Sequence, residues 1–127
     1  EAERLTMSIP GCVIVSGDTP KKERERILEM FKVGEIPVVA NVGVLTTGFD
    51  YPELDTVVMA RPTMSLAMYY QIVGRCIRPY KGKTAWFVDL CGNINRFGEV
   101  SDLHLKDTGN GKWAVFSKGR QLTNVRF

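Results

Sequence analysis

Two arginines and a glutamine share one face of a helix that the sequence predicts over residues 65–77. Gln71, Arg75 and Arg78 follow one another at intervals of four and three residues, so at about 100° per residue they fall on one stripe. Two guanidinium groups this close repel each other modestly and are most favourable when they face a shared anion such as a phosphate. A solvated face with surface carboxylate partners has the same spacing, so the pattern alone leaves both interpretations open.

A second candidate site is the loop of residues 41–50, which connects two predicted strands. Its sequence, NVGVLTTGFD, contains hydroxyl, amide and carboxylate side chains and two glycines. Ligands of open α/β sheets bind outside the carboxyl ends of the strands, where such groups can approach a phosphate closely. The alternative is structural, with Gly48 ending a short helix and Asp50 capping the turn before Pro52.

One apparent phosphate-binding motif is rejected on its spacing. Gly82-Lys83-Thr84 is similar to the end of a P-loop, but Ile77 stands where the leading glycine belongs and a strand follows instead of a helix. The sequence therefore predicts a turn into a strand here. It also offers no aspartate–glutamate pair at a strand end for magnesium binding and water activation, so we expect the chain alone not to hydrolyse a nucleotide.

The cysteines and the single histidine predict no metal site. Cys12, Cys76 and Cys91 are widely spaced, whereas zinc sites need paired ligands, and we expect them to be reduced thiols in the core. His104 stands in a polar stretch without a cluster of further ligands, which indicates a solvated loop.

The elements that must position these side chains alternate between strands and helices. Short apolar runs predict strands at 12–16, 36–42, 56–60 and 84–90. A first helix is predicted from Thr19 as its N-cap to Gly34, and the second one covers 65–77. Strands that are apolar on both faces and alternate with helices indicate a parallel sheet, so the predicted fold class is α/β.

Further patterns predict how these elements end and pack. In the second helix, one stripe is expected to face the core: Leu66, Tyr70, Val73 and Ile77. Two short strands at 113–117 and 122–127, joined through Gly119, predict a C-terminal β-hairpin. The first eight residues are expected to be the tail of a helix.

Composition limits the function classes. The chain has 127 residues, 44% hydrophobic and 24% charged, as in one globular domain. No apolar run is long enough to span a membrane and no secretory signal is visible, so we expect a cytoplasmic protein without a membrane partner. The net charge of +3 permits a polyanionic partner.

The order of the motifs resembles the second RecA-like domain of superfamily 2 helicases of the DExH type. VLTTGFD is similar to motif V of that family and QIVGRCIRP to its motif VI, and Arg24 matches the arginine of an earlier helix. The resemblance covers residues 11–98, and GNINRFG with the polar tail resembles the RadD branch. It implies a RecA-like parallel sheet with helices on both faces, incomplete at its N-terminus, in residues 1–98, and an extension of residues 99–127 with the β-hairpin.

The resemblance also implies roles for the candidate residues. Arg78 would be the arginine finger that reaches the γ-phosphate of ATP, with Arg75 beside it and Gln71 helping to seat the site. Gly48 and Asp50 would approach the nucleotide from motif V. The residues that would contact the backbone of one nucleic-acid strand are Thr46, Thr47, Asn41 and Arg24.

Parts that the family needs and this sequence lacks imply a partner domain. ATP with Mg²⁺ would be bound mainly by a first RecA-like domain with a Walker A lysine and a DExH motif, and neither motif occurs here. We expect a C-terminal fragment of an ATP-dependent helicase that acts on DNA, with RNA as the alternative, and that is inactive alone.

Two other functions remain open at this point. A non-enzymatic RecA-like module would bind nucleic acid or a partner protein without meeting ATP. A stand-alone doubly wound enzyme for small molecules would need its own phosphate-binding glycine loop after the first strand, and the sequence has none there.

Overall fold

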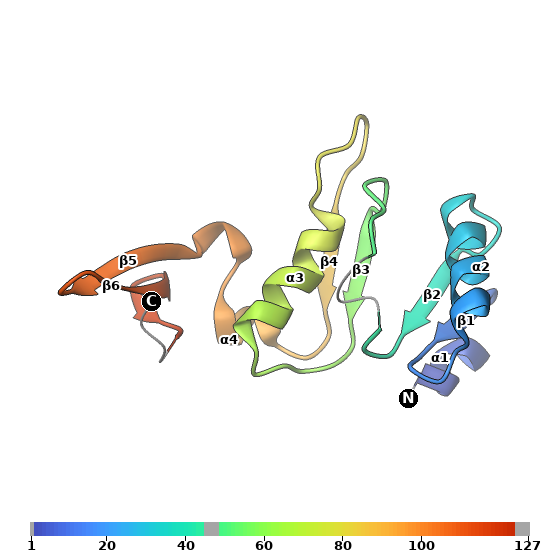
Figure 1. Ribbon diagram of the computed structural model, residues 1–127, viewed down its shortest axis with the longest axis horizontal. Coiled ribbons are helices and arrows are strands. Elements are labelled where there is room, and N and C mark those ends of the chain that lie inside the picture. Colours follow the sequence, from blue (N-terminus) through green and yellow to red (C-terminus); the bar gives the residue numbers. More distant parts are fainter. Residues whose placement is uncertain (1, 45–48, 124–127) are drawn as a thin grey trace. The chain divides into compact units, whose positions relative to one another are not determined.

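The computed structural model describes residues 2–44 and 49–123, and the chain divides into two compact units, residues 1–51 and 52–127 (Figure 1).

The first unit is built around two parallel strands. β1 (Cys12–Val15) pairs with β2 (Val38–Asn41), α1 (Ala2–Ser8) precedes them, and the crossover between them contains α2 (Lys21–Lys32). The buried core of this unit consists of Val15, Ile27 and Ile36. The helix and the strands can bury these side chains only against each other. The predicted strand–helix–strand order is confirmed, and β2 is shorter than the predicted strand at 36–42.

The start of α2 differs from the prediction. Thr19 is not the N-cap, because its Oγ1 accepts a hydrogen bond from the Ser16 backbone N–H at 3.0 Å and closes the turn after β1. Pro20 takes the N-cap position with φ −55° and ψ 145°, and it offers no side-chain cap. The hydroxyl that was expected to start the helix therefore stabilises the preceding loop instead.

The second unit begins with another parallel pair joined by a helical crossover. β3 (Thr56–Met59) pairs with β4 (Trp86–Asp89) in the register Thr56↔Trp86 to Met59↔Asp89, and α3 (Leu66–Cys76) connects them. Met59, Tyr69, Val73 and Phe97 form the core between this helix and the strands. Parallel strands with helical crossovers in both units confirm the α/β class.

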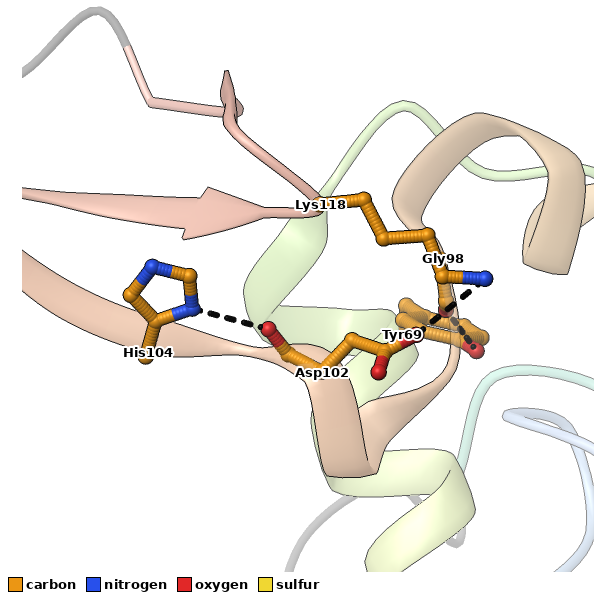
Figure 2. A network of polar contacts seen from close by, with 5 residues as sticks. All are labelled: Tyr69, Gly98, Asp102, His104 and Lys118. Atoms are coloured by element: carbon orange, nitrogen blue, oxygen red, sulfur yellow. Dashed lines mark hydrogen bonds and ion pairs between the residues drawn. The ribbon is translucent and has the colours of Figure 1, made fainter.

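The packing face of α3 is rotated from the predicted one. Tyr69 and Cys76 are buried beside Val73, whereas Tyr70 and Ile77 are 56% and 49% exposed. Tyr69 stacks on Phe97 with ring centroids 5.2 Å apart. It also donates its hydroxyl to the Gly98 carbonyl oxygen at 2.8 Å, and Figure 2 shows the two partners of this hydrogen bond. The stripe with Tyr69 and the stripe with Tyr70 both have helical spacing. The stripe with Tyr69 is buried, and there the tyrosine hydroxyl has a hydrogen-bond partner.

The C-terminal part contains more sheet than expected. After α4 (Asn93–Phe97) and a short 3-10 helix, η1 (Val100–Asp102), the strands β5 (His104–Gly109), β6 (Lys112–Ser117) and β7 (Arg120–Gln121) form one antiparallel sheet. The predicted hairpin through Gly119 is present as β6–β7. The predicted second strand, 122–127, was wrong in its position: β7 covers 120–121, residues 122 and 123 belong to no strand, and residues 124–127 lie outside the described part.

β5 replaces the loop that was expected around His104. The side chain is exposed at the start of the strand, and its Nδ1 donates to the Asp102 carbonyl oxygen at 3.0 Å in the tautomer with that nitrogen protonated. Lys118 Nζ lies 3.4 Å from the Asp102 carboxylate and connects β6 to the same segment (Figure 2). The short polar strand lacked the apolar alternation that would have predicted it.

Close packing fixes this sheet to α4. Gly98, with φ +85°, lies so near β6 that a Cβ there would collide with the Ser117 side chain. Arg120 also donates a hydrogen bond to the Arg96 carbonyl oxygen. The glycine is therefore required both for the backbone angle and for the contact.

All three cysteines are free thiols; Cys76 is buried, and Cys12 and Cys91 are half-buried. Burial raises the pKa of the Cys76 thiol. None of the helices in the described residues is long and apolar enough to cross a membrane.

Candidate functional site

One face of α3 and the residues after it form a small pocket. Gln71, Arg75 and Arg78 line a depression of about 210 Å³ together with Tyr70 and Gly74. The structure thus brings the three predicted side chains to one place. The charged groups among the residues that line this pocket are two guanidiniums, which can donate to an anion.

The ends of α3 determine how these side chains are presented. Ser65 caps the helix, with its Oγ accepting from the Met68 backbone N–H at 3.2 Å. Arg75 stands in the last turn, where a cation is favourable for the helix dipole. Arg78 lies beyond the last helical residue, in an exposed segment, yet it lines the same pocket.

A buried asparagine holds the loop that leads into α3. Asn93, which is 0% exposed, accepts from the Thr63 backbone N–H at 2.9 Å and donates to the Arg61 carbonyl oxygen at 3.2 Å. Arg96 donates to the Thr63 carbonyl oxygen at 3.0 Å and to Asn93 Oδ1 at 3.3 Å. The segment before Ser65 is therefore fixed by two side chains of α4.

The first unit gathers two predicted nucleic-acid contacts at one sheet edge. Arg24 stands in the first turns of α2, and its guanidinium donates to the Thr19 carbonyl oxygen at 3.2 Å. Asn41 ends β2, and its Oδ1 accepts from the Val44 backbone N–H at 3.0 Å. β1 and β2 are parallel, so the start of α2 and the end of β2 lie at the same edge.

Asp50 is placed by two aromatic neighbours. Phe49 is 8% exposed, and Tyr51 packs edge-on against Phe31, with ring centroids 5.6 Å apart, and donates its hydroxyl to the Lys32 carbonyl oxygen at 3.3 Å. The Phe49 ring also lies under the Lys32 ammonium, 5.9 Å from the ring centroid, so both neighbours contact α2, and Asp50 between them is exposed. The other candidates of this loop, Thr46, Thr47 and Gly48, lie outside the described residues.

Metal ligands do not cluster in the part of the chain that the structure describes. No three His, Cys, Asp or Glu side chains of residues 2–44 and 49–123 come together in a group that could hold a metal ion.

The sequence of this chain matches that of a known protein family over more than half of its length. Residues 3–80 match the family described as Helicase conserved C-terminal domain. The chain belongs to this family.

Relatives of this helicase C-terminal domain include ATP-dependent helicases. A 51.5 kDa protein of a Lactococcus phage (isolate 7-9) is 36% identical over 103 residues, covering 80% of this chain and 23% of the phage protein. A Saccharomyces cerevisiae protein named as the ATP-dependent helicase IRC3 is 39% identical over 87 residues, covering 68% of this chain and 12% of the yeast protein. The domain thus spans less than a quarter of the length of either relative.

A solved structure supports the fold. The C-terminal domain of the DEAD-box protein Dbp5 has a TM-score of 0.57 and 25% identity to this helicase C-terminal domain, over 68% of this chain and 51% of that one. The expected RecA-like α/β fold is confirmed.

Two site residues of the helicase C-terminal domain could not be assigned from the sequence. Arg96 stood out as a basic residue in GNINRFG without a role, and the structure shows it bonded to Thr63 and Asn93. Asn93 had no distinguishing signal, because a buried asparagine and a surface asparagine look the same in a sequence.

Asp89 closes the turn from β4 into α4 in this helicase C-terminal domain. Its carboxylate accepts from Asn93 Nδ2 at 2.9 Å and from the Cys91 and Ile94 backbone N–H groups at 3.1 and 2.8 Å. Burial alone would raise the pKa of Asp89, but these hydrogen bonds outweigh it and hold the pKa below its ordinary value of 3.8. A carboxyl whose pKa is lowered by folding stabilises the fold above its unfolded pKa, and this contribution is lost as the pH falls through the folded pKa.

We therefore expect Asp89→Asn to lower the free energy of unfolding by about 2 kcal/mol at neutral pH, because hydrogen bonds to a charged group contribute about 1.5–3 kcal/mol. The difference should shrink as the pH falls below 3.8, where more than half of the unfolded chains carry a protonated Asp89. Urea unfolding from neutral pH down to about pH 3 measures it. Asp55→Asn, an exposed site, is the control, and a difference that stays constant with pH would contradict a role for the charge.

Proposed function

We propose that this domain is the second motor domain of an ATP-dependent superfamily 2 helicase or translocase of the DExH type. In this proposal it supplies Arg78 as an arginine finger to an ATP site that a first RecA-like domain completes. The observation that carries the proposal is the pocket that brings Gln71, Arg75 and Arg78 together. The proposal places the protein in the cytoplasm and assigns residues 1–98 to the motor domain and 99–127 to an extension.

The donor set of the pocket fits the phosphates of ATP. Guanidinium groups donate in a planar fork that matches phosphate oxygens, and Gln71 adds a neutral donor and acceptor. Bound ATP with Mg²⁺, held mainly by the first domain, supplies the phosphoryl group that is transferred to water. Arg78 neutralises the charge that develops on this group, and Arg75 and Gln71 hold the neighbouring oxygens.

Motif V and the sheet edge of the first unit are proposed to contact the nucleotide and the nucleic-acid strand. Asp50 and Gly48 approach the nucleotide, with Asp50 accepting from ribose hydroxyls or holding the finger. Thr46, Thr47, Asn41 and Arg24 contact the backbone of a DNA strand, or of an RNA strand in the alternative. Contacts to the backbone carry little sequence information, which suits a motor that must act on any sequence. The shared edge of Arg24 and Asn41 supports this assignment.

The proposal is tested by comparing the full-length protein with the 127-residue chain. We expect nucleic-acid-stimulated ATP hydrolysis from the full-length protein and none above buffer from the chain alone, because half of the composite site is missing. A phosphate-release assay with single-stranded DNA and, separately, RNA measures both. Turnover by the isolated chain that persists through further purification would contradict the half-site, and absence of turnover in the full-length protein would contradict the motor.

A further inference from the structure

The ammonium of Lys83 joins the end of α3 to the segment before β3. Its Nζ donates to the Cys76 carbonyl oxygen at 2.8 Å, to the Pro52 carbonyl oxygen at 2.7 Å and to the Leu54 carbonyl oxygen at 3.1 Å. A lysine ammonium has three N–H donors, and here each has a carbonyl acceptor. Lys83 is thus fully engaged by the protein backbone and is not a phosphate ligand, in agreement with the rejected P-loop.

These bonds close the segment that carries Arg78. Cys76 is the last residue of α3, where carbonyl groups lack partners within the helix. Residues 77–82 follow and are exposed, and the Lys83 backbone N–H donates to the Tyr80 carbonyl oxygen at 3.2 Å. Arg78 therefore lies in a short loop whose beginning is bonded to the Lys83 side chain and whose end is bonded through the Lys83 backbone.

A second contact joins the same two segments. The Tyr80 hydroxyl donates to Glu53 Oε1 at 2.8 Å, so the loop of Arg78 is bonded to residues 52–54 from two of its positions. The Tyr80–Glu53 pair is exposed, whereas Lys83 is half-buried. Residues 52–54 stand two to four positions after Asp50 of motif V and lead into β3. Lys83 thus bonds the segment that follows motif V, residues 52–54, to Cys76 in motif VI.

We propose that Lys83 is a positioning residue for Arg78, which keeps the arginine where it can reach the transferred phosphoryl group. The inference rests on the proposed function, because it needs Arg78 to be the finger. An arginine on a long side chain is effective only within a narrow range of geometry, and an exposed loop without the Lys83 bonds would sample many positions. The expected role is therefore in turnover and not in ATP binding.

The test is a double-mutant cycle in the full-length protein, with ATP hydrolysis as the readout. We expect Lys83→Met to lower kcat at least tenfold while the KM for ATP and the Tm change little, because methionine keeps the apolar stem and loses the donors. In the Arg78→Ala background the same change should have no further effect on the residual turnover. Lys81→Met is the matched control, since Lys81 is exposed two residues earlier and makes no hydrogen bond or ion pair within the described residues.

The other outcomes would contradict either the positioning role of Lys83 or the proposed role of Arg78. Equal losses of kcat from Lys83→Met in both backgrounds would overturn the positioning role and indicate a general structural one. A loss of kcat no larger than that of Lys81→Met would also overturn the positioning role. Should Lys83→Met fail to fold, the exposed Tyr80→Phe replaces it, with a smaller drop in kcat that must also vanish in the Arg78→Ala background. Unchanged turnover in Arg78→Ala alone would refute the finger itself, whatever Lys83 does.

Discussion

Arg78→Ala in the full-length protein is expected to lower nucleic-acid-stimulated ATP hydrolysis by about 10³-fold or more. An arginine finger compensates the charge on the transferred phosphoryl group, and its contribution to the rate is about 10³–10⁵. Removal of such a group acts on the transition state more than on the bound substrate, so kcat should fall while the affinity for ATP changes little. Steady-state phosphate release gives kcat, and equilibrium binding of a fluorescent ATP analogue gives the affinity.

A matched control separates this effect from a loss of positive charge. Arg4→Ala removes an exposed arginine of α1 and should leave kcat unchanged. Arg75→Ala should cause a smaller loss than Arg78→Ala, because Arg75 is proposed to hold neighbouring oxygens. Turnover that survives Arg78→Ala would refute the finger assignment.

Asn93→Leu is expected to cause the largest loss of stability, about 3 kcal/mol or more. The leucine has a similar volume but leaves the partly buried Thr63 N–H and Arg61 carbonyl groups facing an apolar side chain in place of their partner, and a polar group that loses its hydrogen bond in this way costs about 1–3 kcal/mol. Asp89 and Arg96 lose a partner as well. Urea unfolding of the 127-residue chain, followed by tryptophan fluorescence, measures the change, since both tryptophans, Trp86 and Trp113, stand in the second unit.

The same helix provides the control for this experiment. Asn95→Leu makes the same substitution on α4 at an exposed position, and it should change the free energy of unfolding by less than about 0.5 kcal/mol. If Asn93→Leu cost no more than Asn95→Leu, the hydrogen bonds to the loop before α3 would not be needed for stability.

Local patterns were sufficient for the fold class and for the pocket on α3. Short apolar runs of five to seven residues predict the parallel strands because such strands bury their side chains. Gln71, Arg75 and Arg78 could be grouped because helical spacing alone brings them together, and the pocket that they line confirms that grouping. Their chemical roles stay predictions.

Tertiary contacts determined what the sequence could not. Tyr69 and Tyr70 are adjacent and both fit a packing stripe. Contacts with Phe97 and with the Gly98 carbonyl oxygen, which are distant in the sequence, distinguish Tyr69. The three carbonyls around Lys83 come from the segment before β3 and from the end of α3, and no spacing rule connects these two places. β5 was missed because its pairing with β6 is needed to stabilise a strand of polar residues.

The attachment of α3 at both ends has a mechanical consequence. Free helix ends fray and absorb small displacements, but here Thr63, just before the helix, is held by α4, and Cys76, its last residue, is held by Lys83. The 11-residue helix is then a stiff rod about 16 Å long. We therefore expect a displacement of the segment before β3, to which Lys83 bonds, to move α3 and Arg75 together as one rigid unit.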